Sequence, residues 1–519
     1  MVDVEKRKKN TFYHTIVFKV SAVAIMFFAI WGAVSPESLA ENGSMISGFI
    51  NHSFGWLYLV AVSCFVVFCL YLALSKYGNI KLGKEDEKPE FSFFSWLSML
   101  FAAGFGAGIV FWGVAEPLTH FANPPIAGVE PQSAEAARVA MRYAFFNWGI
   151  HQWSVFVLVG LALAYFQFRK KSKLLVSETL ESLSTKKKRK SIKHTVNILA
   201  VIATVTGVAT SLGMGVLQIN AGLSYVFSIP DYVWMPVIIV GAMFVLYMLS
   251  AITGLDKGIK ILSTTNMVLV IGFMVVFLFQ GPTVFILESF VLGIGDYIQH
   301  FVEMSFYLTP YTGEKWAHDW TIFYWAWVIT WSPFVGSFIA RISRGRTIRE
   351  FVLGVLIIPP VIGFIWMSIF GGTGLFMDLF ENKQIADAVS QDVATAIFVF
   401  LQHFPMYGVL SILMIALVMI FLITSVDSTV YVLGIMTSDG NENPSNMLKT
   451  IWGVLIAATT AVLIMSDGLK ALEAIALITA LPFTLVMILI SVSLFKSLRS
   501  EQTANVSAWA DRQKQKKAQ

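Results

Sequence analysis

One hydrophobic stretch in the second half of the chain carries a stripe of aromatic side chains. At about 100° per residue of an α-helix, Tyr324, Trp327 and Trp331 fall on one face, together with Val328. An indole ring has a negative π face, which attracts a cation that a dry pocket does not otherwise solvate. A quaternary ammonium group suits such a pocket because it has no N–H. The stripe therefore predicts a cation cage, with packing or interfacial anchoring as the alternative.

A second aromatic group lies in another hydrophobic stretch. Trp148, Trp153 and Phe156 fall within an arc of about 140° on a helix. If this helix packs against the first stripe, the two groups together enclose a pocket. From spacing alone, packing remains the competing interpretation.

Hydroxyl side chains form two further groups. Thr206 and Thr210 share a helix face, and Phe421, Thr424 and Ser425 stand at positions i, i+3 and i+4. Hydroxyl and backbone oxygens are the ligands that a hard cation such as Na⁺ takes. Ser and Thr in apolar helices also bond back to their own carbonyls, and the spacing does not separate the two interpretations.

Ionisable residues are rare inside the hydrophobic stretches. Glu116 precedes Pro117, and Asp427 lies two residues after Ser425. His151 lies in the second aromatic stretch. An ionisable group at such a position is a functional candidate by default. The alternatives are a helix-capping role for Glu116, an indirect role for Asp427 and a structural hydrogen bond for His151.

Two helix-breaking sequences occur within apolar stretches. One is the glycine run GFGAG, residues 104–108, and the other contains Pro333. Broken backbone at membrane depth survives only where protein, water or a ligand satisfies it. Breaks at corresponding places in two halves of a chain indicate a transporter binding site. The glycine run also fits close helix packing, but it lacks the preceding strand of a nucleotide-binding loop.

The elements that position these residues are membrane helices. The chain of 519 residues is 56% hydrophobic and 13% charged, with a mean hydropathy of +0.70. A soluble protein of this size cannot hide so much apolar surface. We predict an all-α integral membrane protein with about twelve transmembrane helices. The predicted spans are 12–34, 53–75, 93–116, 138–167, 195–222, 231–252, 258–280, 319–341, 349–372, 407–435, 448–466 and 471–495.

The distribution of basic residues predicts the orientation. Lys and Arg concentrate in alternate connections and in both terminal segments, with one weak exception at the connection that holds Asp439 and Lys449. The intervening connections collect acidic residues. The basic segments are 6–9, 76–88, 169–193, 257–260, 341–349 and 496–499. Because Lys and Arg favour the cytoplasmic side, we expect a multi-pass protein of the cell membrane with both termini in the cytoplasm. Topology explains the positive charge, so we expect no nucleic-acid partner.

The spans define the organisation of the chain. A soluble catalytic domain does not fit between them, and the sequence contains no HExxH, no GxSxG and no paired catalytic carboxylates. We therefore predict a protein that is not an enzyme, with no cofactor. The expected segments are a cytoplasmic tail at 1–11, two peripheral helices at 12–92, a five-helix block at 93–280, an outer interfacial helix and loop at 281–317, a second five-helix block at 318–495 and a cytoplasmic tail at 496–519.

With these residues identified, the chain resembles the betaine/choline/carnitine transporter family. The most specific stretches are GFGAGIVFWGVAEP at 104–117 and WTIFYWAWVITWSPFVGSFIARISRG at 320–345. The resemblance covers nearly the whole chain. It implies the five-plus-five inverted repeat of sodium-coupled amino-acid transporters, preceded by two extra helices. It also implies a homotrimer in contact with membrane lipid.

The resemblance also implies the site residues. The substrate-binding residues would be Gly104, Phe105, Gly106, Trp148, Trp153, Phe156, Trp327, Val328 and Trp331. One sodium site would consist of the backbone of Ala102 and Phe105 with Phe421, Thr424 and Ser425. A second would use Thr206 and Thr210, with the Phe334 ring nearby.

The departures from the family pattern bear on the substrate. Betaine carriers of this family typically have Tyr in place of Phe156, a second Trp in place of Val328 and Met in place of Phe105. Loss of one indole face removes about 0.5–2 kcal/mol of cation–π attraction. Either a betaine is held by fewer rings or the pocket suits another head group.

We therefore predict a Na⁺-coupled symporter that imports a betaine-type compatible solute, glycine betaine above all, by alternating access. Retention of Thr424 and Ser425 favours sodium, because the ion-independent exchangers of the family fill these sites with other groups. The alternatives are a carrier of taurine, carnitine or choline, a proton-coupled carrier and an ion-independent exchanger. An osmosensor whose basic segments bind anionic lipid is a further class.

Overall fold

The computed structural model describes residues 15–104, 106–183, 189–230, 232–253 and 256–518. Phe105, one of the predicted site residues, lies outside them. Helices form most of this part of the chain, and the described part of each predicted span is largely helical. The described residues contain nine helices long and apolar enough to cross a membrane, or ten if the bent pair Thr264–Gln280 and Thr283–Gln299 counts as one span.

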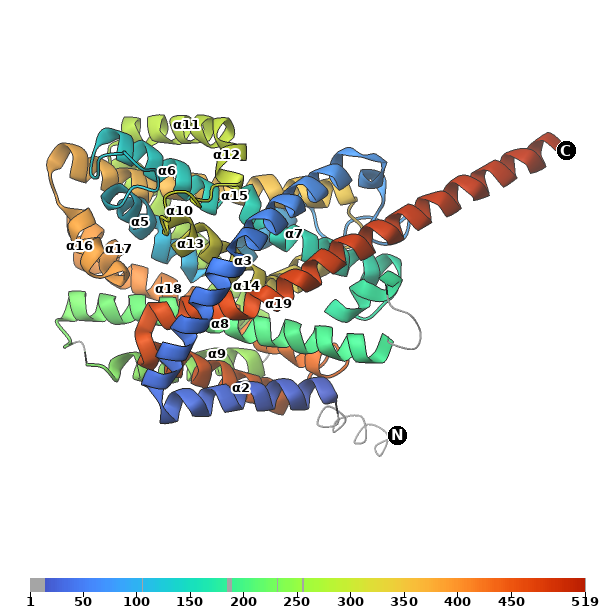
Figure 1. Ribbon diagram of the computed structural model, residues 1–519, viewed down its shortest axis with the longest axis horizontal. Coiled ribbons are helices and arrows are strands. Elements are labelled where there is room, and N and C mark those ends of the chain that lie inside the picture. Colours follow the sequence, from blue (N-terminus) through green and yellow to red (C-terminus); the bar gives the residue numbers. More distant parts are fainter. Residues whose placement is uncertain (1–14, 105, 184–188, 231, 254–255, 519) are drawn as a thin grey trace.

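The first half of the chain contains helices α2 to α10, joined by short connections (Figure 1). Their bounds are α2 Ile16–Val34, α3 Pro36–Leu74, α4 Phe93–Gly104, α5 Ala107–Ala122, α6 Ala134–Asn147, α7 Ile150–Ala164, α8 Arg189–Phe227, α9 Met235–Thr253 and α10 Asp256–Gln280. A short 3-10 helix at Lys76–Asn79, a π-helical turn at Tyr165–Arg169 and a longer 3-10 helix at Val176–Leu183 lie between them.

The second half begins with helices that leave the direction of α10. The axes of α10 and α11 differ by 112° across the Gly281–Pro282 break, and α11 lies across one edge of the bundle in Figure 1. The bounds are α11 Thr283–Gln299, α12 Phe301–Ser305, α13 Trp316–Asp319, α14 Thr321–Ile342, α15 Ile348–Glu381, α16 Ile385–Gln391, α17 Ala396–Leu401, α18 Tyr407–Thr437 and α19 Asn446–Ala518, with a single turn at Val393–Thr395.

Local sequence sets several helix ends. Pro36 occupies the first turn of α3, where its missing N–H costs nothing and its fixed φ favours the helix. Thr347 and Glu350 form a reciprocal capping box at the start of α15. In the long helix α19, Asp467 and Gly468 have non-helical dihedral angles, so a kink separates two helices there. This kink falls in the gap predicted between the last two spans.

The helix breaks agree only in part with the prediction. The chain leaves the helix between Gly104 and Ala107, as the glycine run predicts. The expected break at Pro333 is wrong, because α14 continues through it. Proline removes the N–H that would bond the carbonyl of Ile329, and the Ser332 hydroxyl donates to that carbonyl at 2.8 Å. The structure adds a break that was not predicted, at Trp148 and Gly149 between α6 and α7.

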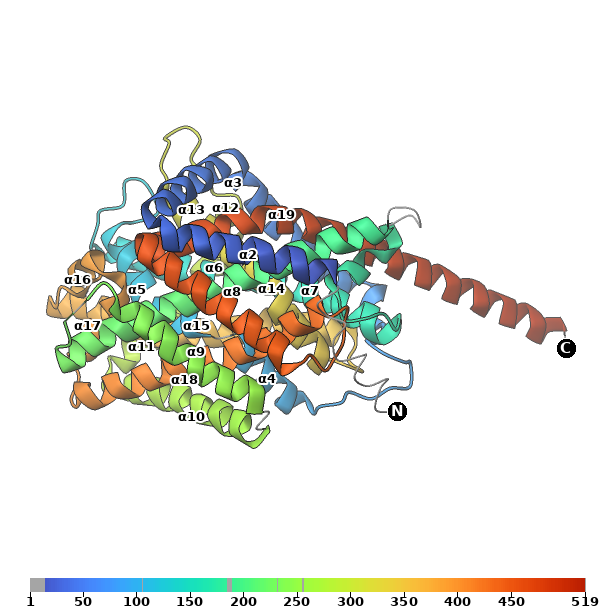
Figure 2. The ribbon, with the colours of Figure 1, turned by 90° about the horizontal axis from the view of Figure 1, so that it is seen from below.

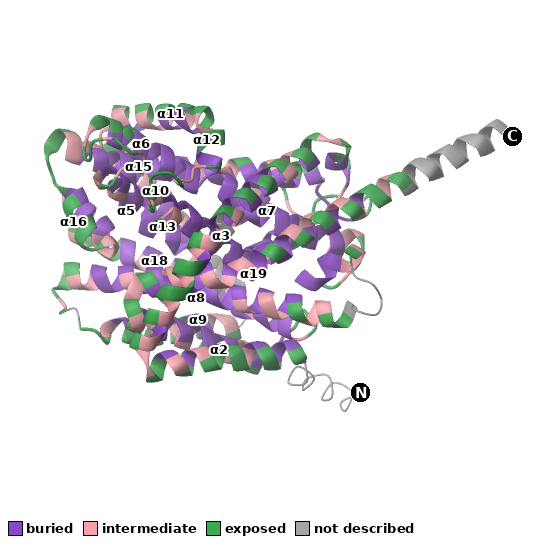
Figure 3. Ribbon diagram, in the orientation of Figure 1, coloured by how far each residue is buried: buried purple, intermediate pink, exposed green. Residues whose placement is uncertain are grey.

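Burial divides the helices into inner and outer ones. Nearly all of α7 and α14 is buried, whereas α2, α9 and α10 expose apolar side chains such as Phe27, Ile238 and Val268 (Figure 3). Outward apolar surface of this extent is typical of the helices of a multi-pass membrane protein. Figure 2 shows α2 and α3 on one side of the bundle and α10 on the opposite side, with α7 and α14 between them.

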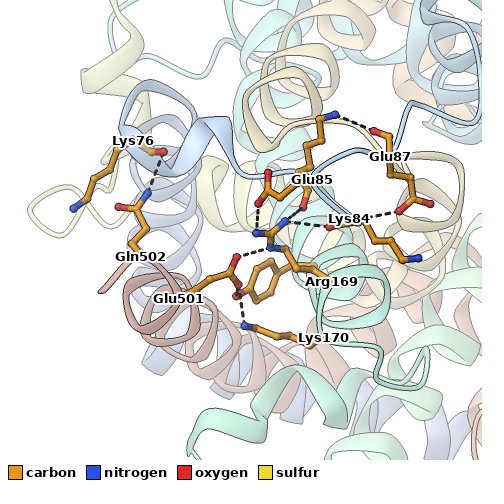
Figure 4. Close-up of polar contacts among 11 residues, drawn as sticks. Lys76, Lys84, Glu85, Glu87, Arg169, Lys170, Glu501 and Gln502 are labelled. Atoms are coloured by element: carbon orange, nitrogen blue, oxygen red, sulfur yellow. Dashed lines mark hydrogen bonds and ion pairs between the residues drawn. The ribbon is translucent and has the colours of Figure 1, made fainter. Parts of the chain in front are cut away.

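The final helix continues past the predicted membrane boundary. α19 extends to Ala518 and projects from the bundle in Figure 1. Where it leaves the bundle, Glu501 bonds to Tyr165, Arg169 and Lys170, and Arg169 also donates to Glu85 at 2.5 Å (Figure 4). These contacts tie the end of α7 and the connection after α3 to the base of the projecting helix.

Candidate functional site

A small enclosed pocket lies where the break after α4 meets the break after α6. Its cavity volume is about 10 Å³, which is about the space that one water molecule needs. Its walls come from the start of α5, the α6–α7 junction and helices α8, α14 and α18. The lining residues are Gly106, Ala107, Gly108, Ile109, Trp148, Gln152, Val208, Ser211, Leu212, Trp327, Val328, Trp331, Leu422, Ser425 and Val426.

Three of the four indole rings of the predicted cage, those of Trp148, Trp327 and Trp331, line this pocket. Trp327 and Trp331 are near parallel, with centroids 6.3 Å apart and planes at 16°. Trp148 stands at 80° to Trp327, with centroids 6.3 Å apart. Val328 completes the α14 wall. The stripe on α14 therefore meets Trp148 of predicted span four, an arrangement that the sequence analysis gave as one of two interpretations.

Two predicted cage residues lie behind the wall instead of on it. The Phe156 ring packs edge-on against Trp331 at 6.0 Å, and Trp153 packs against Phe156 at 5.6 Å. Both rings are buried and support the indole of Trp331 from the α7 side. In this conformation they shape the cage without lining the cavity.

The glycine run gives the indoles room. A Cβ on Gly108 would lie 2.4 Å from Cη2 of Trp327, and one on Gly106 would lie 3.2 Å from Cη2 of Trp331. The first distance is impossible without movement of the ring, and the second is tight. Close packing and pocket formation, which the sequence left as alternatives, are therefore the same feature here.

Polar groups of the pocket include two residues that the sequence prediction missed. Trp327 donates its indole N–H to the Ser211 hydroxyl of α8 at 3.0 Å. Gln152 is buried, and its Oε1 has no hydrogen-bond partner within the described part of the chain; the same holds for Nε1 of Trp331. Polar residues within apolar spans were the available signal for Ser211 and Gln152. Ser211 directly follows Thr210 and Gln152 directly precedes Trp153, so each lies on a different helix face from the group that the sequence analysis identified.

A buried carboxylate holds one wall of the pocket. Oε2 of Glu116 accepts hydrogen bonds from Nε1 of Trp148 at 2.8 Å and from the Tyr324 hydroxyl at 2.5 Å. Its Oε1 accepts from the Asn147 amide at 2.8 Å, and His120 Nε2 lies 3.4 Å away. Glu116 is thus a fully partnered group beneath the cage, and not a cap for the helix break.

The chain matches a known protein family over nearly its whole length. The sequence model of the betaine/carnitine/choline transporter family matches residues 16–503. The chain belongs to this family. The family membership makes it a transporter and not an enzyme.

Its relatives are transporters. The transporter is 52% identical to the ectoine/hydroxyectoine transporter of Virgibacillus pantothenticus, over 93% of this chain and 96% of that protein. It is 49% identical to the glycine betaine transporter OpuD of Bacillus subtilis, over 94% of each chain. It is 37% identical to the high-affinity choline transport protein of Escherichia coli K12, over 98% of this chain and 76% of that protein.

The two hydroxyl residues predicted for a first sodium site follow each other on α18. Ser425 lines the pocket, and a Cβ on Gly106 would lie 4.0 Å from its Oγ. Thr424 donates to the carbonyls of Ile420 and Phe421 at 2.9 and 3.2 Å. Phe105 lies outside the described residues, as do the side chains of residues 101–104, which include the predicted Ala102. Gly104 is the last residue of α4.

The hydroxyls predicted for a second sodium site face the last helix of the transporter. Thr206 pairs with Thr479 of α19 at 2.7 Å, and Thr210 donates to the Leu472 carbonyl of α19 at 3.0 Å. The ring of the predicted Phe334 packs against Trp331 at 6.1 Å. The three residues therefore lie on α8 and α14, with the two threonines directed to α19.

The other ionisable candidates have structural partners. Nε2 of His151 pairs with the Ser305 hydroxyl of α12 at 2.9 Å, and its ring stacks on Trp325. Asp427 accepts from Ser250 at 2.5 Å and from Ser428 at 3.0 Å. These contacts support the structural alternative for His151 and give Asp427 a role in joining α9 to α18.

Proposed function

We propose that this transporter is a Na⁺-coupled symporter that imports a betaine-type quaternary ammonium compatible solute, glycine betaine above all, by alternating access. One observation carries the proposal. The indoles of Trp148, Trp327 and Trp331 surround a single pocket at the interrupted helix after Gly104. Such a group of π faces suits a cation without N–H donors.

The two ends of a betaine find complementary groups in this pocket. The indole faces suit the trimethylammonium end. Gly106 caps α5, so the positive end of that helix dipole and the first N–H groups of α5 suit the carboxylate. The glycine betaine and ectoine transporters among the relatives handle zwitterions according to their names, which agrees with a pocket of two polarities.

The small size of the cavity indicates that the pocket must open to bind solute. A volume of about 10 Å³ is too small for a betaine, so the indoles must separate for solute to bind. Movement of α5 and α14 relative to α8 and α18 provides this opening, because the pocket lies between these helices. We propose that this movement alternates access between the two sides of the cell membrane, with both termini in the cytoplasm.

The remaining features of the proposal follow from the same fold. Two features support twelve crossings and the five-plus-five repeat. Helices α4 and α5 are each too short to span a membrane but form one crossing across their break, and the kink divides α19 into two crossings. Sodium coupling is supported by Ser425 at the pocket wall beside Thr424. We further propose a homotrimer embedded in membrane lipid.

Uptake into proteoliposomes tests the proposal. Labelled glycine betaine is supplied with an inward Na⁺ gradient, and in a parallel sample with K⁺ in place of Na⁺ at the same pH. Sodium-dependent accumulation is the expected result. Equal uptake in the two samples would refute sodium coupling. The absence of uptake in both samples would refute betaine as the solute. Unlabelled choline, carnitine, taurine and ectoine serve as competitors.

A second candidate solute, ectoine, is favoured by one polar atom. The buried Oε1 of Gln152 belongs to a lining residue and has no partner within the described residues. A quaternary ammonium group cannot donate to it, whereas the N–H groups of a protonated cyclic amidine such as ectoine can. Gln152→Leu distinguishes the two: it should weaken ectoine uptake by about tenfold or more if ectoine uses this acceptor, and leave betaine uptake within about twofold.

A further inference from the structure

A single carboxylate holds both an aromatic wall of the pocket and the ring above it. Trp148 and Tyr324 donate to the same oxygen, Oε2 of Glu116, although they come from the α6–α7 junction and from α14. The side chain of Glu116 is fully buried, and it comes from a third element, α5. The carboxylate therefore connects α5 with the two elements that carry the indole cage.

Trp148 is the cage residue with the weakest backbone support. It occupies the break after α6, with φ −98° and ψ 5°, and the next helix begins only at Ile150. A side chain at such a junction is less constrained than Trp327 and Trp331, which stand within continuous α14. Its indole N–H donates to Glu116 at 2.8 Å, and this hydrogen bond fixes the ring.

The second donor extends this control to the neighbouring ring. The Tyr324 ring contacts Trp148 at 5.7 Å and Trp327 at 6.1 Å. Because Glu116 fixes both Trp148 and Tyr324, it also sets the edge-on geometry between Trp148 and Trp327. That geometry decides how many π faces a cationic head group meets.

We propose that Glu116 is a positioning residue for the solute pocket, acting through the indole of Trp148. This inference rests on the proposed function, since it assigns to Glu116 the orientation of a ring that contacts the solute. The carboxylate itself does not line the cavity and is not a ligand of the head group.

The local hydrogen bonds offer a variant that keeps the geometry. In Glu116→Gln the amide oxygen can accept from Trp148 and Tyr324, and the new NH₂ group needs an acceptor in place of the Asn147 donor. Oδ1 of Asn147 has no partner within the described part of the chain, so rotation of the Asn147 amide supplies one. Glu116→Ala, in contrast, leaves both donors unsatisfied.

Equilibrium binding of labelled glycine betaine to the purified full-length transporter provides the first measurement. We expect Glu116→Ala to raise the Kd at least about tenfold, or about 1.4 kcal/mol. Glu116→Gln should restore the Kd to within about threefold of the wild-type value. Asp296→Ala, which removes another buried carboxylate whose partners are Arg138 and Arg142, is the matched control and should leave the Kd within the same range.

A double-mutant cycle separates positioning from general stability. In a Trp148→Phe background the indole N–H is absent, so Glu116→Ala should change the Kd less than about twofold. The same tenfold loss in both backgrounds would overturn the proposal, because Glu116 would then not act through Trp148. Wild-type binding by Glu116→Ala, or equal losses for the Ala and Gln variants, would also overturn it.

A solute-independent measurement keeps this test distinct from that of the proposed function. The near-ultraviolet circular dichroism signal of the solute-free transporter that is lost in Trp148→Phe should also be lost in Glu116→Ala and retained in Glu116→Gln. An unchanged signal in Glu116→Ala would overturn the positioning role. Failure of the wild-type protein to bind betaine would instead refute the proposed solute, and the dichroism result would stand.

Discussion

The indole of Trp327 lies against the backbone of Gly108, so closely that a Cβ at this glycine would stand 2.4 Å from its Cη2. Real Cβ atoms do not approach so near, and the neighbouring atom is part of a rigid ring held by Ser211. The start of α5 and the α14 wall therefore form a matched pair, in which the small residue permits the large one.

Gly108→Ala should displace Trp327 and impair transport. Overpacking of this kind costs about 1–3 kcal/mol, and we expect the uptake rate to fall by about tenfold or more at normal protein levels. Gly272→Ala in α10 is the matched control, because a Cβ there meets nothing within 4 Å. Equal uptake by the two variants would show that Trp327 does not need its present position.

Trp331→Leu should abolish uptake while the protein still folds and inserts. The cage already has Val328 where betaine carriers of the family typically have a second Trp. The substitution removes a further π face, which costs about 0.5–2 kcal/mol in cation–π attraction, and it also opens the wall toward Phe156. Trp234→Leu, at a Trp that is 52% exposed, is the control. Proteoliposome uptake and size-exclusion chromatography measure function and folding, and normal uptake by Trp331→Leu would exclude the cage.

The sequence predicts helices and their aromatic faces better than it predicts breaks. Period and hydropathy placed the stripe of α14 correctly, since both depend on local spacing. Pro333 suggested a break that tertiary structure prevents, because Ser332 satisfies the freed carbonyl. The break at Trp148 was missed because no proline marks it, and only Gly149 signals it. A Cβ there would lie 2.7 Å from the Tyr297 hydroxyl, a contact from a distant helix that no local pattern reveals.

The site shows the same division between local and long-range information. Glu116 could be recognised as an unusual charge in an apolar span, but its four partners come from three elements. Gln152 and Ser211 belong to the pocket only because α7 and α8 meet there. Phe156 and Trp153 have the right residue type and helix face, but depth within the wall depends on packing.

Removal of the hydroxyls at the proposed ion site should weaken sodium dependence. In Thr424→Ala combined with Ser425→Ala, two oxygen ligands for a hard cation are lost, and the sodium concentration for half-maximal uptake should rise by about tenfold or more. Thr429→Ala is the control, because its hydroxyl donates to the Ser425 carbonyl in the same helix. An unchanged sodium response would place the ion elsewhere.

Acid should loosen the outer helix α11. Burial alone raises the pKa of Asp296, but the hydrogen bonds and charge of Arg138 outweigh it and hold the pKa below its usual value. A lowered pKa stabilises the folded state at pH values above the ordinary carboxylate pKa of about 3.9. This stabilisation is lost as the pH falls through the lower pKa of the folded state. Hydrogen exchange of residues 283–299 should therefore increase below about pH 4.

The matched variant locates this effect at the ion pair. Arg138 donates to Asp296 at 2.7 and 2.8 Å, and its side chain is 41% exposed, so we expect Arg138→Leu to cost only about 1 kcal/mol at neutral pH. In that variant the acid-induced increase in exchange should be smaller. The same pH profile in both proteins would assign the effect to another group.

Neutralisation of Glu501 should release the start of the projecting part of α19 from the bundle. Its carboxylate accepts hydrogen bonds from Tyr165, Arg169 and Lys170, and the pKa of Glu501 is lowered because these bonds outweigh burial. Arg169 is largely buried, so Glu501→Gln leaves a cation that is only partly compensated by Glu85 and by the Gly83 carbonyl.

Loss of one partner from such a network costs about 3 kcal/mol, which would speed hydrogen exchange in residues 496–503 by about a hundredfold if local opening governs it. Lys173→Ala is the control, since its pair with Asp439 is exposed on both sides and contributes little. Equal exchange rates in wild type and Glu501→Gln would mean that apolar packing, such as that of Phe495 on Tyr77 at 5.9 Å, holds this part of the helix by itself.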